Sequence, residues 1–147
     1  KNLFDRANIK CIVPKDMVYD MWHKFMCNVS ENQSAAILGI PFGAWVVSEH
    51  ANAIREAAMR EVVAIANKKG IPLSEEDIVA QRKVFPRIPY ENKPSTLQDI
   101  EAGRKTEVDI FAGAVIRMGK EVGVETPLNE FFYHGIRVLE EKNEGVI

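Results

Sequence analysis

One stretch near the start of the chain limits the possible folds more than any other. Four apolar residues recur there at the spacing of a single helix face: Val18, Trp22, Phe25 and Val29. Three polar residues follow one another at intervals of four: Lys24, Asn28 and Asn32. On a helix, each step of four turns the side-chain direction by about 40°, so these three form one narrow stripe. The sequence therefore predicts an amphipathic helix with a polar stripe beside its apolar face.

The other polar residues of this stretch are expected to point more nearly away from the apolar face: Asp20, His23, Cys27 and Glu31. The stripe itself has two interpretations. A single lysine is usually solvated and a single asparagine often makes a local hydrogen bond, which favours an ordinary surface. Asparagine is a poor helix former, however, and donors and acceptors at the edge of a core suit a small polar ligand. On these residues alone, both interpretations stay open.

The composition fits one domain with one core. The chain has 147 residues, of which 46% are hydrophobic and 27% charged. The formal net charge is -2 without a basic run, so we expect no nucleic-acid partner and no membrane partner. Cys11 and Cys27 form no CxxC pair, which favours reduced thiols in a cytoplasmic protein. A first residue of Lys1 fits a fragment of a longer protein as well as a processed end.

Helical periodicity and break signals predict an all-α array of about six helices. We expect a lead-in over 1–15, with an extended piece over 10–14 and with Asp16 capping a helix from Met17 to the low thirties. Residues 35–38 either continue that helix or begin another, before Gly39 breaks the pattern. A long helix follows over 49–69, with Gly70 after its end. Its solvent-facing side is expected to carry four charged residues: Arg55, Glu56, Arg60 and Glu61.

The second half of the chain gives three further helix signals. Ser74-Glu75-Glu76-Asp77 has the form of a capping box and predicts a short helix to about Val84. Ser95 or Thr96 is expected to cap the next helix, and another is expected over 107–120. Thr126-Pro127 reads as N-cap and first residue of a last helix that reaches about Glu141.

Several common chemical motifs are missing from the sequence. There is no G-x-G-x-x-G after a strand and no Walker P-loop, so no nucleotide-binding loop is expected within the chain. His23, His50 and His134 lack metal-ligand spacing and are expected at the surface or at helix caps, so no metal is predicted. Trp22 and Trp45 are expected to anchor the core.

A second polar group lies between Ser95 and Asp109, and by itself it reads as an ordinary charged helix surface. It combines with the stripe into a longer pattern: Trp22-x-Lys24-x-x-x-Asn28-x-x-x-Asn32, Leu97-Gln98-Asp99, Gly103-Arg104-x-Thr106-Glu107-x-Asp109, Gly113 and Gly123-Val124-x-Thr126-Pro127-x-Asn129. In order and spacing, over nearly the whole chain, this pattern resembles the C-terminal domain of the ketopantoate reductase (2-dehydropantoate 2-reductase) family.

The resemblance implies an all-α fold like that of the C-terminal domains of 6-phosphogluconate dehydrogenases. It implies NADPH-dependent reduction of 2-dehydropantoate to pantoate, a reaction of pantothenate biosynthesis. In this family an N-terminal Rossmann domain holds NADPH, and the all-α domain closes the substrate cleft. Residues 1–147 resemble that second domain alone, so the resemblance implies a partner Rossmann domain in a longer protein and an inactive isolated chain.

The matched motifs imply roles for particular residues: catalysis for Lys24 and Glu107, and substrate binding for Asn28, Asn32 and Ser95. The residue types suit the chemistry. Hydride attack on a ketone develops negative charge on oxygen, which an ammonium group can stabilise and protonate. A neighbouring carboxylate can position the lysine and accept a substrate hydroxyl, while neutral amides orient the substrate without adding charge.

One position departs from the family pattern, and other interpretations remain. Family members can carry a further polar substrate contact in the Pro41-Phe42-Gly43 turn, where Phe42 cannot form a hydrogen bond. A related 2-oxo acid is therefore an alternative substrate to ketopantoate. The remaining alternatives are another hydroxy-acid dehydrogenase domain and a helical dimerisation or binding module without activity. A homodimer is expected because an exposed apolar cleft wall favours self-association.

Overall fold

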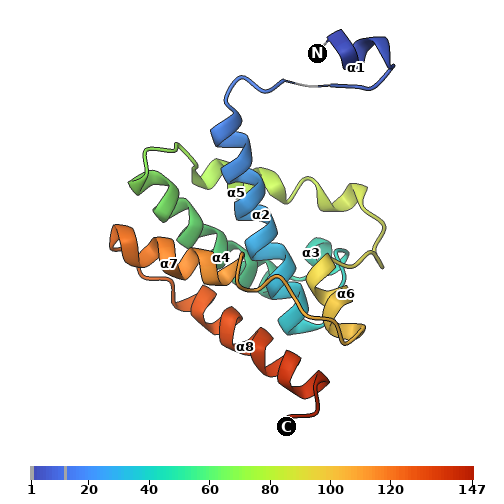
Figure 1. Ribbon diagram of the computed structural model, residues 1–147, viewed down its shortest axis with the longest axis vertical. Helices are drawn as coiled ribbons and strands as arrows, with labels where there is room; N and C mark the ends of the chain where they lie inside the picture. Colours follow the sequence, from blue (N-terminus) through green and yellow to red (C-terminus); the bar gives the residue numbers. More distant parts are fainter. Residues whose placement is uncertain (1, 12) are drawn as a thin grey trace.

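All regular structure in the described part of the chain is helical. The computed structural model describes residues 2–11 and 13–147, and Figure 1 shows the helices that follow α1 gathered around the long helix α2. This confirms the predicted all-α fold, and six of the helices have seven residues or more. The elements are α1 (Asn2–Arg6), α2 (Met17–Leu38), α3 (Ala44–Val47), α4 (Glu49–Lys68), α5 (Glu75–Gln81), the 3-10 turn η1 (Phe85–Arg87), α6 (Ser95–Glu101), α7 (Ala112–Val122) and α8 (Pro127–Asn143).

The central helix α2 is one uninterrupted element of 22 residues. Asp16 caps it as predicted, because its Oδ1 accepts the backbone N–H of Tyr19 at 2.9 Å. Residues 35–38 continue the helix, which ends at Gly39 with φ of 64°. Only glycine adopts this left-handed conformation readily, so a local feature of the sequence sets the end of α2.

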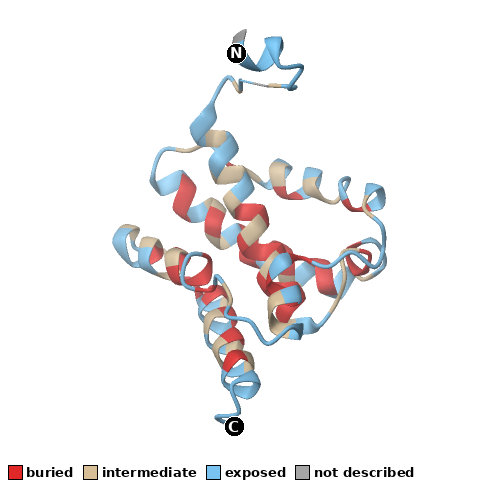
Figure 2. Ribbon diagram, turned by 45° about the vertical axis from the view of Figure 1, so that its right-hand side comes forward, coloured by how far each residue is buried: buried red, intermediate tan, exposed pale blue. Residues whose placement is uncertain are grey.

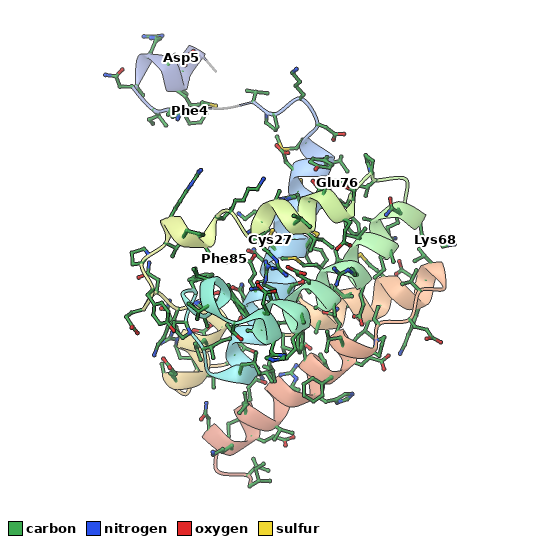
Figure 3. All side chains as sticks on the ribbon, turned by 180° about the vertical axis from the view of Figure 1, so that it is seen from behind. Phe4, Asp5, Cys27, Lys68, Glu76 and Phe85 are labelled. Carbon is green, nitrogen blue, oxygen red and sulfur yellow. The ribbon has the colours of Figure 1, made fainter. Side chains whose placement is uncertain are left out.

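The short helix α1 lies apart from the helical body. Figures 1 and 3 show α1, with Phe4 and Asp5, separated from the other helices. The lead-in predicted over 1–15 therefore holds a short helix that the sequence pattern did not indicate. The extended piece predicted over 10–14 includes Ile12, which, like Lys1, lies outside the described residues.

The helices α4 and α5 begin as predicted. The long helix α4 ends one residue before its predicted end, and Gly70 follows with φ of 79°. The capping box at the start of α5 is confirmed, since the N–H of Ser74 donates to Asp77 Oδ2 at 2.8 Å. The prediction that α5 reaches Val84 is wrong, because the α-helix ends at Gln81 and gives way to η1. Past Gln81 the backbone tightens, because the N–H groups of Arg82, Lys83 and Val84 each donate to the carbonyl three residues earlier, at 3.1–3.2 Å.

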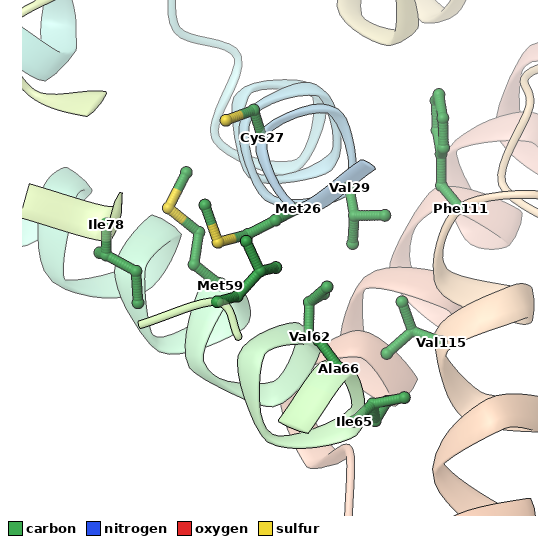
Figure 4. Close-up of a cluster of buried hydrophobic side chains, with 11 residues drawn as sticks. Met26, Cys27, Val29, Met59, Val62, Ile65, Ala66, Ile78, Phe111 and Val115 are labelled. Atoms are coloured by element: carbon green, nitrogen blue, oxygen red, sulfur yellow. The ribbon is translucent and has the colours of Figure 1, made fainter. Parts of the chain in front are cut away.

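The main core lies between α2 and α4. Figure 4 shows Met26 and Val29 of α2 facing Met59 and Val62 of α4, and all four side chains are fully buried. Burying side chains of this size contributes about 2 kcal/mol each, so the α2–α4 contact is a major source of stability. Figure 2 shows the buried residues concentrated where the helices cross.

Both tryptophans contribute to the core, as predicted. Trp45 is 2% exposed in a second cluster with Phe85, and the half-buried Trp22 packs against the main core. Phe42 also belongs to the second cluster, where its ring stacks on Phe85 with 6.2 Å between ring centroids. The Pro41-Phe42-Gly43 turn is therefore held by an aromatic contact inside the protein.

Candidate active site

The predicted stripe occupies one face of α2. Lys24 is exposed, and Asn28 and Asn32 are half-buried. Their side chains make no hydrogen bond or ion pair with any residue in the described ranges 2–11 and 13–147. An ammonium and two amides that are not used inside the fold can act on a bound molecule.

The opposite border of α2 differs from the prediction. Cys27 and Glu31, expected to point away from the core, are 8% and 7% exposed. The reason is that α5 lies over this side of α2, where Gln81 Nε2 donates to Glu31 Oε1 at 2.9 Å and the Tyr19 hydroxyl donates to Asp77. A helix has a solvent-facing side only where no other element covers it, and periodicity alone does not show the covering element.

Ser95 lies at the start of α6, a helix that packs directly on α2. The prediction that Ser95 or Thr96 caps this helix is wrong, because Pro94 is the N-cap residue and Ser95 is already helical. Proline fits this position, since its fixed φ and missing N–H do not oppose a helix start. The Ser95 side chain is exposed and has no hydrogen-bond partner among the described residues.

Glu107 lies in a turn rather than in the helix predicted over 107–120. The helix α7 begins at Ala112, and the Glu107 carbonyl accepts the N–H groups of Ile110 and Phe111 at 3.0 and 3.2 Å. The turn is held by α8, because Glu140 Oε1 accepts both the N–H and the hydroxyl of Thr106 at 2.7 Å. Tertiary contacts at Thr106 thus prevail over the helical spacing of the sequence.

The two residues that follow Glu107 are fixed while its own side chain is exposed. Val108 is fully buried, and Arg137 Nη2 donates to Asp109 Oδ2 at 2.6 Å. The Arg137 guanidinium lowers the pKa of the Asp109 carboxyl. The Glu107 carboxylate has no partner within the described part of the chain. The fold therefore holds the backbone of Glu107 and leaves its carboxylate available.

The turn that carries Glu107 contacts the second half of α2. Phe111 packs in the same buried cluster as Val29, and the N–H of Ala112 donates to Gln33 Oε1 at 3.0 Å. The structure thus brings together the three elements that carry the candidate residues: α2, the start of α6 and the 107–111 turn. We predict that Lys24, Asn28, Asn32 and Glu107 converge on one cleft, and this stays a prediction.

The structure contains a cluster of buried charged residues beside the stripe, which the sequence did not predict. Arg55, expected to face solvent, is fully buried and lies over the Phe85 ring at 4.8 Å. It donates to Asn52 Oδ1 at 2.9 Å, and it pairs with Glu56 at 3.3 Å and with Glu31 at 3.4 Å. Glu56 is also buried, whereas Arg60 is exposed as predicted. Only the folded arrangement of the aromatic rings and α5 reveals this cluster.

Burial changes the ionisation of two side chains in this region. It raises the pKa of Glu31 to about 7, even though Arg55 lies beside the carboxylate. It also raises the pKa of the Cys27 thiol to about 12, so this thiol is protonated near neutral pH and is a poor nucleophile. Cys27 and the half-buried Cys11 are both free cysteines.

Glu61 is a further correction to the predicted solvent-facing side of α4. This half-buried carboxylate accepts the N–H of Leu128 at 2.7 Å and the N–H of Asn129 at 3.0 Å. It therefore caps α8, which begins at Pro127 as predicted, while the Thr126 side chain makes no capping bond. Capping partners that are distant in the sequence leave no local signal.

The surface next to the stripe contains an apolar hollow of about 270 Å³. Its lining comes from the first half of α2 and from α7: Met21, Trp22, Phe25, Ala114 and Met118. A larger hollow of about 530 Å³ lies between the end of α7 and the start of α8, and no candidate residue lines it. No candidate residue lines the smaller hollow either, but its Trp22 and Phe25 belong to α2, the helix that carries Lys24.

The described residues show few features typical of other kinds of site, such as a metal centre. They contain no group of three or more His, Cys, Asp or Glu side chains placed to hold a metal ion. His50 and His134 are exposed, and His23 is half-buried. Within the same residues, no helix combines the length and the hydropathy that a bilayer-spanning segment requires.

Solved structures with this all-helical fold include reductases and dehydrogenases. A ketopantoate reductase of the PanE/ApbA family from Ralstonia eutropha superposes with a TM-score of 0.85 at 26% identity, over 97% of this chain and 48% of that one. A D-mandelate dehydrogenase, solved with NADH, also gives 0.85 at 26% identity, over 97% of this chain and 50% of its own. The fold is therefore that of one part of such enzymes.

The family follows from the sequence comparison. The family described as ketopantoate reductase PanE/ApbA C terminal matches residues 16–140, and this chain belongs to that family. The 2-dehydropantoate 2-reductase of Pyrococcus horikoshii is 30% identical over 99% of this chain. The chain spans about half the length of the curated relatives it matches, for example 48% of the Pyrococcus protein and 49% of the one from Pyrobaculum aerophilum.

Proposed function

We propose that this chain is the substrate-binding domain of an NADPH-dependent 2-dehydropantoate 2-reductase. In this proposal the domain follows an N-terminal Rossmann domain in a cytoplasmic protein. The observation that carries the proposal is the unpartnered stripe of Lys24, Asn28 and Asn32, on a helix that contacts the turn carrying Glu107. The family match supports the same function.

The residues take complementary roles in this proposal. Lys24 stabilises the charge that develops on the ketone oxygen and supplies the proton, while Glu107 positions the lysine and accepts a substrate hydroxyl. Asn28 and Asn32 orient the 2-oxo acid through neutral amides, and Ser95 contacts its carboxylate. These residue types fit an anionic, hydroxylated substrate, because a cation and uncharged donors face it.

NADPH supplies the hydride and is bound mainly by the other domain. The residues of this chain do not fit a dinucleotide by themselves, since the sequence has no glycine-rich phosphate loop. The proposal therefore includes that the 147-residue chain alone neither binds NADPH tightly nor reduces ketopantoate. Calorimetry with NADPH and an absorbance assay on the pure chain test this, and turnover would refute it.

Kinetics on the full-length protein test the catalytic assignment. We expect Lys24→Ala to lower kcat by about 10²-fold or more, because the ammonium acts on charge present only in the transition state. Asn28→Ala should act more on KM, since an amide contact already exists in the ground state. Lys24→Arg should restore little activity, because the guanidinium keeps the charge but changes the donor geometry and proton transfer.

A wild-type kcat for Lys24→Ala, with the natural 2-oxo acid and with chemistry limiting the rate, would contradict this assignment. An ordinary surface lysine predicts that result, with at most a small change in stability.

A second candidate function is the reduction of a related 2-oxo acid. Phe42 favours it, because its ring replaces a polar contact that family members can carry in this turn. The similarity to a D-mandelate dehydrogenase is a further reason to include 2-oxo acids with aromatic side chains. Comparing kcat/KM for ketopantoate with that for phenylglyoxylate separates the two candidates.

We also propose that the protein forms a homodimer. The apolar hollow beside Trp22 supports self-association, since exposed apolar patches are often interaction sites. Light scattering that shows a strict monomer over a wide concentration range would count against it.

A further inference from the structure

Gln33 is a buried amide next to Asn32, and it hydrogen-bonds to two other helices. Its side chain is fully buried. Its Oε1 accepts the N–H of Ala112 at 3.0 Å, and its Nε2 donates to Asn129 Oδ1 at 3.5 Å and to the carbonyl of Val29 at 2.7 Å. Gln33 therefore ties α2 to the start of α7 and to α8.

The bond to Ala112 caps α7. Ala112 is the first residue of this helix, and its N-cap residue Phe111 makes no side-chain capping bond. A free N–H at a buried helix start needs an acceptor, which α2 supplies through Gln33. The first residue of α7 is thereby fixed against the helix that carries Lys24 and Asn32.

The same bond holds one end of the turn that carries Glu107. The other end is held by Glu140 of α8, which accepts both donors of Thr106. Of these two anchors, Gln33 is the one on α2. The placement of the Glu107 turn relative to Lys24 thus depends on a directional bond from Gln33, whereas the apolar contact of Phe111 with Val29 permits sliding.

We propose that Gln33 is a positioning residue that sets the Glu107 turn against the Lys24–Asn28–Asn32 stripe. This inference rests on the proposed function, in which Glu107 acts together with Lys24. Side chains extend to about 5–6 Å from a helix axis, so rotating α2 by about 10° moves their ends by about 1 Å. A misplacement of about 1 Å at reacting groups can cost about 10²-fold in rate.

Gln33→Met in the full-length enzyme tests the proposal, since methionine has a similar length but forms no strong hydrogen bonds. We expect kcat to fall by at least about 10-fold with KM for the 2-oxo acid nearly unchanged, because both asparagines remain on α2. The decisive readout is a double-mutant cycle with Glu107→Gln. In that background, Gln33→Met should lower kcat by less than about twofold, because the carboxylate it positions is already gone.

Ser34→Ala is the matched control. Ser34 is the next residue, is also fully buried, and bonds only within α2, to the carbonyls of Ser30 and Glu31. Its loss removes a buried hydrogen bond without touching α7, so kcat should stay at the wild-type value. A fall in kcat equal to that of Gln33→Met would show a general effect of buried polar loss and overturn the proposal.

Gln33→Glu keeps the test decisive if Gln33→Met does not fold. Burial keeps a carboxyl group protonated, and the protonated form donates and accepts like the amide. The protonated and the ionised form both accept the N–H of Ala112, so we expect kcat to stay near the wild-type value, and a fall as large as that expected for Gln33→Met would overturn the proposal.

Two results overturn the proposal while leaving the proposed function intact. One is a wild-type kcat for Gln33→Met. The other is an equal loss from the Gln33 substitution with and without Glu107. A different result contradicts the proposed function, namely that the wild-type full-length protein turns over no 2-oxo acid. That result would also overturn this inference.

Discussion

The helices α5 and α8 each begin at a carboxylate, but the two carboxylates come from different distances along the chain. At α5, Asp77 accepts the N–H and the hydroxyl of Ser74, three residues earlier, at 2.8 and 3.1 Å. At α8, Glu61 accepts the N–H groups of Leu128 and Asn129 from 67 and 68 residues away. The first cap stabilises one turn, whereas the second exists only when α4 and α8 are packed together.

The same contrast applies to the buried polar residues of α2. Ser34 bonds to carbonyls of its own helix, while Glu31 and Gln33 bond to other helices on either side of Asn32. Local bonds of this kind form whenever the helix forms. The long-range bonds fix how α2 is rotated and placed, and for that reason they bear on the proposed site.

The largest expected effect comes from breaking a long-range contact at Arg55. Arg55→Met leaves the buried Glu31 without its cation, whereas Glu56 keeps its ion pair with Arg82, so we expect the free energy of unfolding to fall by about 3–5 kcal/mol. Urea denaturation of the 147-residue chain measures it. Adding Glu31→Leu should recover part of the loss, because it removes the buried carboxylate that had lost its partner. A loss below about 1 kcal/mol would show that the cluster tolerates the change.

Removing the distant cap of α8 should have the next largest effect. Glu61→Ala deprives three donors of their acceptor, namely the N–H groups of Leu128 and Asn129 and the Asn129 amide. We expect a loss of about 2–3 kcal/mol, together with faster hydrogen exchange at the start of α8. Glu91→Ala, at an exposed position, is the control and should stay within about 0.5 kcal/mol of wild type.

Removing the local cap of α5 should cost less. Ser74→Ala is expected to lower the free energy of unfolding by about 1 kcal/mol, with faster exchange confined to α5. Urea denaturation and hydrogen exchange measure both parts. If Ser74→Ala cost as much as Glu61→Ala, the distinction between local and long-range caps would not hold.

The last expected effect is a pH dependence at Glu31. Because burial raises its pKa from 4.5 to about 7, the folded state holds a proton that the unfolded state releases between these values. The contribution of Glu31 to stability is therefore full below about pH 4.5 and is lost as pH rises through about 7. We expect the stability of wild type relative to Glu31→Gln to fall over this range. A difference independent of pH would contradict the raised pKa.

The sequence alone determined the three longest helices and the stripe. Periodicity, Asp16, Gly39, Gly70, the capping box and Thr126-Pro127 act within a few residues, so α2, α4 and α8 began and ended close to their predicted bounds. The spacing of Lys24, Asn28 and Asn32 placed them on one helix for the same reason. Interactions of this range form with the helix itself and are visible in the order of the residues.

Only the tertiary structure decided which polar residues are buried and which partners they have. Arg55, Glu31 and Glu61 look solvent-facing in the sequence, but α5, the aromatic cluster and α8 cover them or bond to them. The turn at Glu107 replaced the first residues of a predicted helix, and there Glu140 binds Thr106 from α8. A polar side chain is stable inside a protein only when its donors and acceptors have hydrogen-bond partners. The partners of these side chains lie up to 68 residues away in the sequence. Their identity therefore depends on how the helices pack, which local patterns do not encode.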